Sequence, residues 1–157
     1  MTAFLQLIAG WPGAVFLQEY WIVYLIVNAA HILGIGLLLG AILPLDLLLL
    51  RSTRGRDLAV LGPFLIRTAA TGTTLAVITG LWLFSVRPAE YAGNPAFLSK
   101  AALLVLAICN IALQHRGGRF DAVLCGGQST VRVRALAAAS AILWLSILIA
   151  GRWIGFV

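Results

Sequence analysis

The sequence predicts an all-α integral membrane protein, a single-domain four-helix bundle with a short N-terminal interfacial segment. Of its 157 residues, 62% are hydrophobic and only 10% are charged, and the mean hydropathy is +1.03. Soluble domains typically carry about a quarter charged residues, so a water-soluble domain is excluded. A helix needs about 20 consecutive apolar residues to cross a bilayer. Four stretches meet this requirement, and they cover about residues 21–50, 63–86, 95–114 and 135–157. Because these stretches are continuously apolar and do not alternate, a β-barrel is also excluded.

The first twenty residues are predicted to lie on the membrane surface. No basic residue precedes their apolar stretch, as one would in a cleavable signal peptide, and Trp11-Pro12-Gly13 interrupts the stretch early. The apolar side chains expected to face the lipid are Phe4, Leu5, Ile8, Trp11 and Phe16.

Local signals mark the spans themselves. Asn94 followed by Pro95 is typical of an N-cap and the first turn of a helix. In the first span, Gly36 and Gly40 have the spacing that lets two helices approach closely, so we expect a helix contact there. Pro44 is expected to kink the same helix.

The arginines indicate the orientation of the chain. The net charge is +6, and most of it lies in two of the three connections. The first connection contains Arg51, Arg54 and Arg56, and the third contains Arg116, Arg119, Arg132 and Arg134. Basic connections remain in the cytoplasm, which predicts a multi-pass protein of the bacterial inner membrane with both termini in the periplasm. Since topology explains the basic residues, nucleic-acid binding is not predicted.

Ionisable residues inside a membrane are costly and therefore indicate function. Asn28 and His31 are three residues apart in the first span and share a helix face. At about 1.5 Å per residue, His31 lies about 30 Å from the cytoplasmic boundary, Lys100 about 24 Å and Arg152 about 27 Å. The three basic groups are thus expected to converge in the outer part of the bundle.

Two positive charges beside an imidazole favour an anionic cofactor, and haem b with its propionates fits that description. In this hypothesis His31 coordinates the iron, Lys100 or Arg152 pairs with the propionates, and Trp82 or Trp144 flanks the ring. A quinone head group bound by His31 and Lys100 is a second possibility. A third is that Lys100 and Arg152 extend to the lipid head groups while His31 bonds to a neighbouring backbone.

Other polar residues receive simpler interpretations. His115 ends the third span and is expected to interact with the helix dipole. It lies roughly 25 to 30 Å in depth from His31, too far to share one iron, so haem ligation by His115 is only an alternative. Asp46 and Arg67 are expected to form an ion pair in the inner leaflet. Cys109 and Cys125 do not suggest a disulfide framework or a zinc site.

Motifs of the common catalytic classes are missing, so no catalytic residue can be named. The sequence has no Gly-rich phosphate loop, HExxH, Cys-x-x-Cys or GxSxG.

The chain resembles a family of uncharacterised small bacterial four-helix membrane proteins. The resemblance lies in Asn28-Ala-Ala-His31, in Thr79-Gly80-Leu-Trp82, in Asn94-Pro95-Ala-Phe-Leu-Ser-Lys100 and in Gly151-Arg152-Trp153. It is also distantly similar to the HemJ-type protoporphyrinogen oxidases and to the CopD-like membrane domains of copper resistance. The HemJ pattern has a His in the first helix, a TGLWL-like end of the second, and a Lys and then a His in the third. His31, Leu81-Trp82-Leu83, Lys100 and His115 occupy comparable places, and the resemblance implies haem b.

The sequence therefore favours a haem b-binding redox protein of the inner membrane that transfers electrons with a quinone or a periplasmic partner. The alternatives are a non-catalytic anchor or accessory subunit of a larger membrane complex, a HemJ-like porphyrinogen oxidase, and a copper-handling protein. Copper(I) prefers Cys and Met ligands, and the chain has a single Met.

Overall fold

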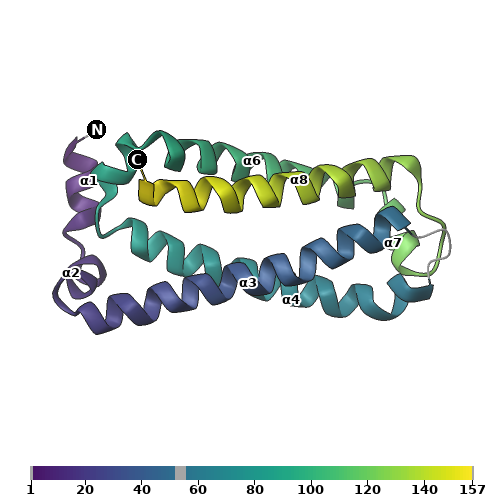
Figure 1. Ribbon diagram of the computed structural model, residues 1–157, viewed down its shortest axis with the longest axis horizontal. Helices are drawn as coiled ribbons and strands as arrows, with labels where there is room; N and C mark the ends of the chain where they lie inside the picture. The colour runs from purple at the N-terminus through teal and green to yellow at the C-terminus, as the bar shows by residue number, and fades with distance from the viewer. Residues whose placement is uncertain (1, 52–55, 157) are drawn as a thin grey trace.

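The computed structural model describes residues 2–51 and 56–156, and the described residues form helices and no strands. Four of the helices are long and apolar enough to cross a membrane. They are α3 (Trp21–Arg51), α4 (Arg56–Phe84), α6 (Pro95–His115) and α8 (Val131–Trp153). The four run side by side along the length of the molecule, and both termini lie at the same end (Figure 1). The predicted all-α, four-helix fold is confirmed.

Short helices cover the two ends of the bundle. They are α1 (Thr2–Ala9), α2 (Pro12–Glu19), α5 (Pro88–Gly93), α7 (Arg119–Leu124) and the 3₁₀ turn η1 (Ile154–Phe156). Helices α1 and α2 lie at the end that carries both termini, which we call the terminal end, and α7 lies at the opposite end (Figure 1). We call that opposite end the arginine-rich end, because Arg51, Arg116 and Arg119 lie there; Arg54 falls outside the described residues.

The boundaries of the spans follow local signals. The side-chain oxygen of Asn94 accepts hydrogen bonds from the backbone N–H groups of Ala96 and Phe97, at 2.9 and 3.2 Å, so the predicted cap of α6 is confirmed. Helix α8 begins at Val131, four residues before the predicted start, because Thr130 caps it. Helix α4 begins at Arg56, seven residues before the predicted apolar span that starts near Pro63, so the helix extends beyond that span. Pro63 lacks a backbone N–H and its ring crowds the preceding turn, yet α4 continues through it.

The four long helices pack as two pairs. Helix α3 packs on α4, α6 packs on α8, and contacts between α3 and α8 join the pairs. The α3/α4 crossing is close because a Cβ atom on Gly34 would lie 2.7 Å from the backbone nitrogen of Ala76. The prediction that Gly36 and Gly40 form a helix contact is wrong, since both are exposed and a Cβ atom added to either would have nothing within 4 Å. They lie on the side of α3 that faces away from α4.

Two apolar clusters form the core. The central cluster consists of Leu38, Ala41, Ala69, Ala107, Trp144 and Ile147. The cluster toward the arginine-rich end consists of Leu45, Leu49, Leu58, Phe120, Val123, Val133 and Ala137. Both draw on α3 and α8, so these two helices form the centre of the bundle.

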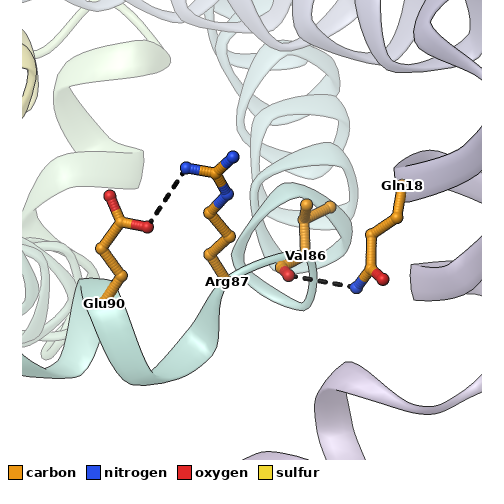
Figure 2. Close-up of polar contacts among 4 residues, drawn as sticks. All are labelled: Gln18, Val86, Arg87 and Glu90. Carbon is orange, nitrogen blue, oxygen red and sulfur yellow. Dashed lines mark hydrogen bonds and ion pairs between the residues drawn. The ribbon is translucent and has the colours of Figure 1, made fainter.

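The N-terminal segment is tied to the terminal end by side-chain hydrogen bonds. Gln18 of α2 donates to the carbonyl oxygens of Ala9 and Val86, at 3.2 and 3.1 Å. Figure 2 shows Gln18 reaching Val86 at the start of the connection that also holds the Arg87–Glu90 ion pair. Phe4, Trp11 and Phe16, which were expected to face lipid, are exposed on the outside of this segment.

Candidate functional site

His31 of α3 lies against Gly80 of α4. A Cβ atom on Gly80 would lie only 2.9 Å from the imidazole carbon Cε1, so a side chain there would displace the ring. The absence of a side chain at Gly80 therefore makes the space that His31 occupies.

The hydrogen bonds of Thr79 determine which imidazole nitrogen carries the proton. The Thr79 hydroxyl donates to the carbonyl oxygen of Leu75 at 2.6 Å, and its oxygen lies 3.0 Å from His31 Nδ1. A hydroxyl has one proton, so when Thr79 donates to Leu75 the bond to His31 is donated by Nδ1–H; this tautomer is assigned from the hydrogen-bond network. In this assignment the neutral imidazole has an unprotonated Nε2. This is the arrangement in which a histidine ligates a metal, with the other ring nitrogen fixed by a hydrogen bond.

Lys100 of α6 lies close to this histidine. Its side chain is half-buried and passes over the backbone of Gly151 in α8, where an added Cβ atom would lie 3.4 Å from Nζ. The ammonium group is close enough to His31 for the two to interact electrostatically. Lys100 therefore points toward α8.

Three aromatic rings lie one turn beyond these residues toward the terminal end. Phe84 and Phe97 stack with ring centroids 5.3 Å apart, and Tyr91 lies 5.6 Å from Phe97 and 6.1 Å from Phe84. We call this group the aromatic cap. Gly80 precedes Phe84 by four residues and Lys100 follows Phe97 by three, so the cap lies directly over the His31 and Lys100 level.

Tyr91 experiences a partly buried environment in this cap. Burial raises the pKa of its phenol above the ordinary value, Tyr24 and Glu90 raise the pKa further, and Arg87 opposes them. The cap was not predicted from the sequence. Its signal is the placement of one aromatic residue on each side of the second connection and one within it.

Arg152 does not join His31 and Lys100, so the expected convergence of three basic groups is wrong for this residue. The Arg152 side chain is exposed, and its guanidinium carbon lies 4.6 Å from the ring centroid of Phe156. Gly151 faces Lys100, and the next residue of a helix points about 100° away. Arg152 therefore faces outward.

The two tryptophans expected to flank a cofactor serve the fold. Trp82 donates its Nε1–H to the carbonyl oxygen of Gly13 at 2.8 Å and thereby ties α2 to α4. Trp144 is 5% exposed and fills the central apolar cluster. Asn28, on the same helix as His31, is exposed.

His115 lies at the arginine-rich end, far from His31. Its Nδ1 is 2.9 Å from the carbonyl oxygen of Ile111 and its ring meets Phe120 edge-on at 5.0 Å. Cys109 and Cys125 are free, exposed thiols. Across residues 2–51 and 56–156, no group of three or more His, Cys, Asp and Glu side chains could hold a metal ion.

The residues at the terminal end fit some ligands better than others. A lone pair on Nε2 fits a metal that accepts one imidazole ligand, and the Lys100 ammonium fits an acidic group beside it. An oxidised quinone needs a hydrogen-bond donor at its carbonyl oxygen, which the Lys100 ammonium can supply although Nε2 in this tautomer cannot. The donor set therefore fits either haem b held by one histidine or a quinone held by Lys100.

Comparison of the chain with protein-family models, with curated proteins and with solved structures finds no match. The candidate site therefore depends on its residues alone.

Proposed function

We propose that the protein is a haem b-binding membrane redox protein in which His31 Nε2 would hold the iron. The observation that carries the proposal is the 3.0 Å hydrogen bond between His31 Nδ1 and Thr79, which fixes the ring and, in the assigned tautomer, leaves Nε2 for a ligand. Bound haem would supply one-electron redox chemistry. Thr79 orients the imidazole, Gly80 makes room for it, and Lys100 pairs with a propionate.

The aromatic cap adds to the environment of this site. Its three rings cover the polar level from the terminal end and limit the access of water. A low dielectric strengthens the attraction between Lys100 and an anionic group. The resemblance of His31, Leu81-Trp82-Leu83 and Lys100 to the HemJ pattern makes porphyrinogen oxidation an alternative activity.

The proposed location is the bacterial inner membrane with both termini in the periplasm. Arginines gather at the end opposite the termini, which supports a cytoplasmic position for that end. His31 then lies in the outer half of the bilayer, where electrons could pass to a quinone or to a periplasmic protein.

A second candidate function is that of a non-catalytic subunit in a larger membrane complex. The exposed amide of Asn28 favours it, because a polar side chain inside the membrane usually faces protein and not lipid. Purification with a stoichiometric partner, whose activity survives in a His31→Ala variant, would support this candidate against the haem proposal.

The test is an absorption spectrum of the purified protein, produced with and without added haem, in the oxidised and reduced states. We expect a Soret band that disappears in His31→Ala and remains in the matched control His115→Ala. A wild-type protein without this band after haem supplementation refutes the proposal. Metal analysis of the same samples shows whether copper is bound where iron is not.

A further inference from the structure

We propose that Asp46 of α3 is a proton-binding site at the joint between the two helix pairs. The site is separate from His31, and its ligand is a proton. The carboxyl group is buried against a hydroxyl: Asp46 is 3% exposed and Ser140, opposite it on α8, is 7% exposed.

The level of Asp46 and Ser140 lies between the two apolar clusters. Toward the terminal end, Ala41 and Trp144 belong to the central cluster. Toward the arginine-rich end, Leu49 and Ala137 belong to the other cluster. The carboxyl group is thus enclosed by apolar side chains on both sides.

No cation among the described residues compensates the carboxyl group. The expected ion pair between Asp46 and Arg67 is wrong, because Arg67 is exposed, and among the described residues the one ion pair is Arg87–Glu90 at the terminal end. Toward the arginine-rich end, the other described charged or titratable side chains of the elements around Asp46 are also exposed, whereas His31 and Lys100 are half-buried toward the terminal end. The exposed ones are Arg51 on α3, Asp57 on α4, Cys109 and His115 on α6, Arg119 and Asp121 on α7, and Arg132 and Arg134 on α8.

One carboxyl oxygen of Asp46, Oδ2, has no hydrogen-bond partner. An ionised carboxylate in this position would be a buried charge with an unsatisfied oxygen, which is strongly unfavourable. A bound proton removes the charge. The Ser140 hydroxyl lies within hydrogen-bonding reach of the group and can either accept from a carboxylic acid or donate to a carboxylate.

A proton fits this site better than a metal ion. A hard cation needs about six oxygen ligands, and Asp46 and Ser140 supply only a carboxyl group and a hydroxyl. The nearby amide of Asn110 already donates to the carbonyl oxygen of Leu136 at 3.1 Å.

Two polar side chains of α6 lie against α8 on the side of the arginine-rich end. Gln114 lies one turn beyond Asn110 on α6, its amide donates to the carbonyl oxygen of Val133 at 3.3 Å, and its side-chain oxygen is buried without a partner. Asn110 and Gln114 share one face of α6 along α8.

Proton binding at Asp46 bears on how the two helix pairs pack. Contacts between α3 and α8 join the pairs, and Asp46 and Ser140 lie at that interface. Loss of the proton places a charge inside the interface and so favours separation of α3 from α8. The protonation state of the Asp46 carboxyl group thus determines how tightly α3 packs against α8.

The first test uses infrared spectroscopy of the wild-type protein in lipid at neutral pH. We expect the C=O stretching band of a protonated carboxylic acid, with a shift in deuterated water. The band should be lost in Asp46→Asn and kept in Asp57→Asn, which replaces an exposed acid. If the wild type shows no such band, or if the band survives in Asp46→Asn, the proposal is wrong.

The second test measures the melting temperature at about pH 6 and about pH 9. In the unfolded chain Asp46 ionises freely at both values, whereas the folded chain must keep a proton, so the wild type loses stability as the pH rises. Asp46→Asn carries a permanently neutral side chain of the same shape and should lose less. Equal losses in the two proteins would contradict the proposal.

Discussion

Replacement of Thr79 by valine keeps the shape of the side chain and removes the oxygen that accepts from His31 Nδ1–H. The same change removes the 2.6 Å hydrogen bond from the hydroxyl to Leu75, but that carbonyl oxygen stays within the backbone hydrogen bonds of α4. The principal effect is therefore on the imidazole. With Nδ1–H unsatisfied, the ring loses its fixed orientation and either nitrogen can carry the proton.

Thr79→Val should change two quantities, the affinity for haem and the unfolding free energy. Loss of a hydrogen bond that orients a ligating histidine typically weakens ligand binding by about 10- to 100-fold. The unfolding free energy of the ligand-free protein should fall by about 1 kcal/mol, the lower part of the usual cost of an unsatisfied donor, because His31 is only half-buried. Haem titration followed by absorbance measures the first quantity, and denaturant unfolding measures the second.

The matched control is Thr73→Val on the same helix. The Thr73 hydroxyl donates to the carbonyl oxygen of Ala69 at 2.8 Å, as Thr79 does to Leu75, but no imidazole depends on it. We expect wild-type haem affinity in Thr73→Val. If both variants bind haem equally well, Thr79 does not orient the ligand and the assigned tautomer of His31 is wrong.

Two further predictions concern the packing of α3 and the aromatic cap. Gly72→Ala places a Cβ atom 2.5 Å from the backbone nitrogen of Leu38, so it should destabilise the protein by about 1–3 kcal/mol in denaturant unfolding. In Gly36→Ala the new Cβ atom has no neighbour within 4 Å, so the change in unfolding free energy should be zero or a stabilisation of up to about 1 kcal/mol. A destabilisation equal to that of Gly72→Ala would contradict the observed α3/α4 crossing. The raised pKa of Tyr91 predicts that the difference in phenolate absorbance between wild type and Tyr91→Phe has a midpoint above about pH 10. The phenol of Tyr91 keeps its proton to higher pH in the folded protein than in the unfolded chain. Its contribution to the unfolding free energy is therefore complete below about pH 10 and is lost as the pH rises further. A titration midpoint of Tyr91 at or below about pH 10 would refute the buried environment.

The sequence predicts the spans well because membrane insertion depends on the length of an apolar run. Helix α3 ends one residue from its predicted boundary, and α6 begins at the predicted Asn94-Pro95 cap. Such signals are local: the residues that form them are neighbours in the chain, and no knowledge of helix packing is needed to interpret them.

The direction in which a side chain points is harder to predict, and the errors have this common cause. Counting residues predicts only a depth for Lys100 and Arg152, whereas the contact of Gly151 with Lys100 determines that Arg152 faces outward. In the same way, small residues occur on two faces of α3, and the contact with α4 selects Gly34 over Gly36. Rotation of a helix about its axis is fixed by packing against its neighbours, which a single sequence does not specify.

Helix α3 carries both proposed sites, and their positions make them independent. His31 and Asp46 are fifteen residues apart, about 22 Å along a helix, and they contact different neighbours, α4 and α8. Substitutions at such a separation normally have additive effects on the unfolding free energy. The double variant His31→Ala/Asp46→Asn should therefore show the sum of the two single effects to within about 0.5 kcal/mol. A larger deviation would mean that α3 moves as a rigid element between two arrangements, so that a proton bound at one end alters the histidine at the other.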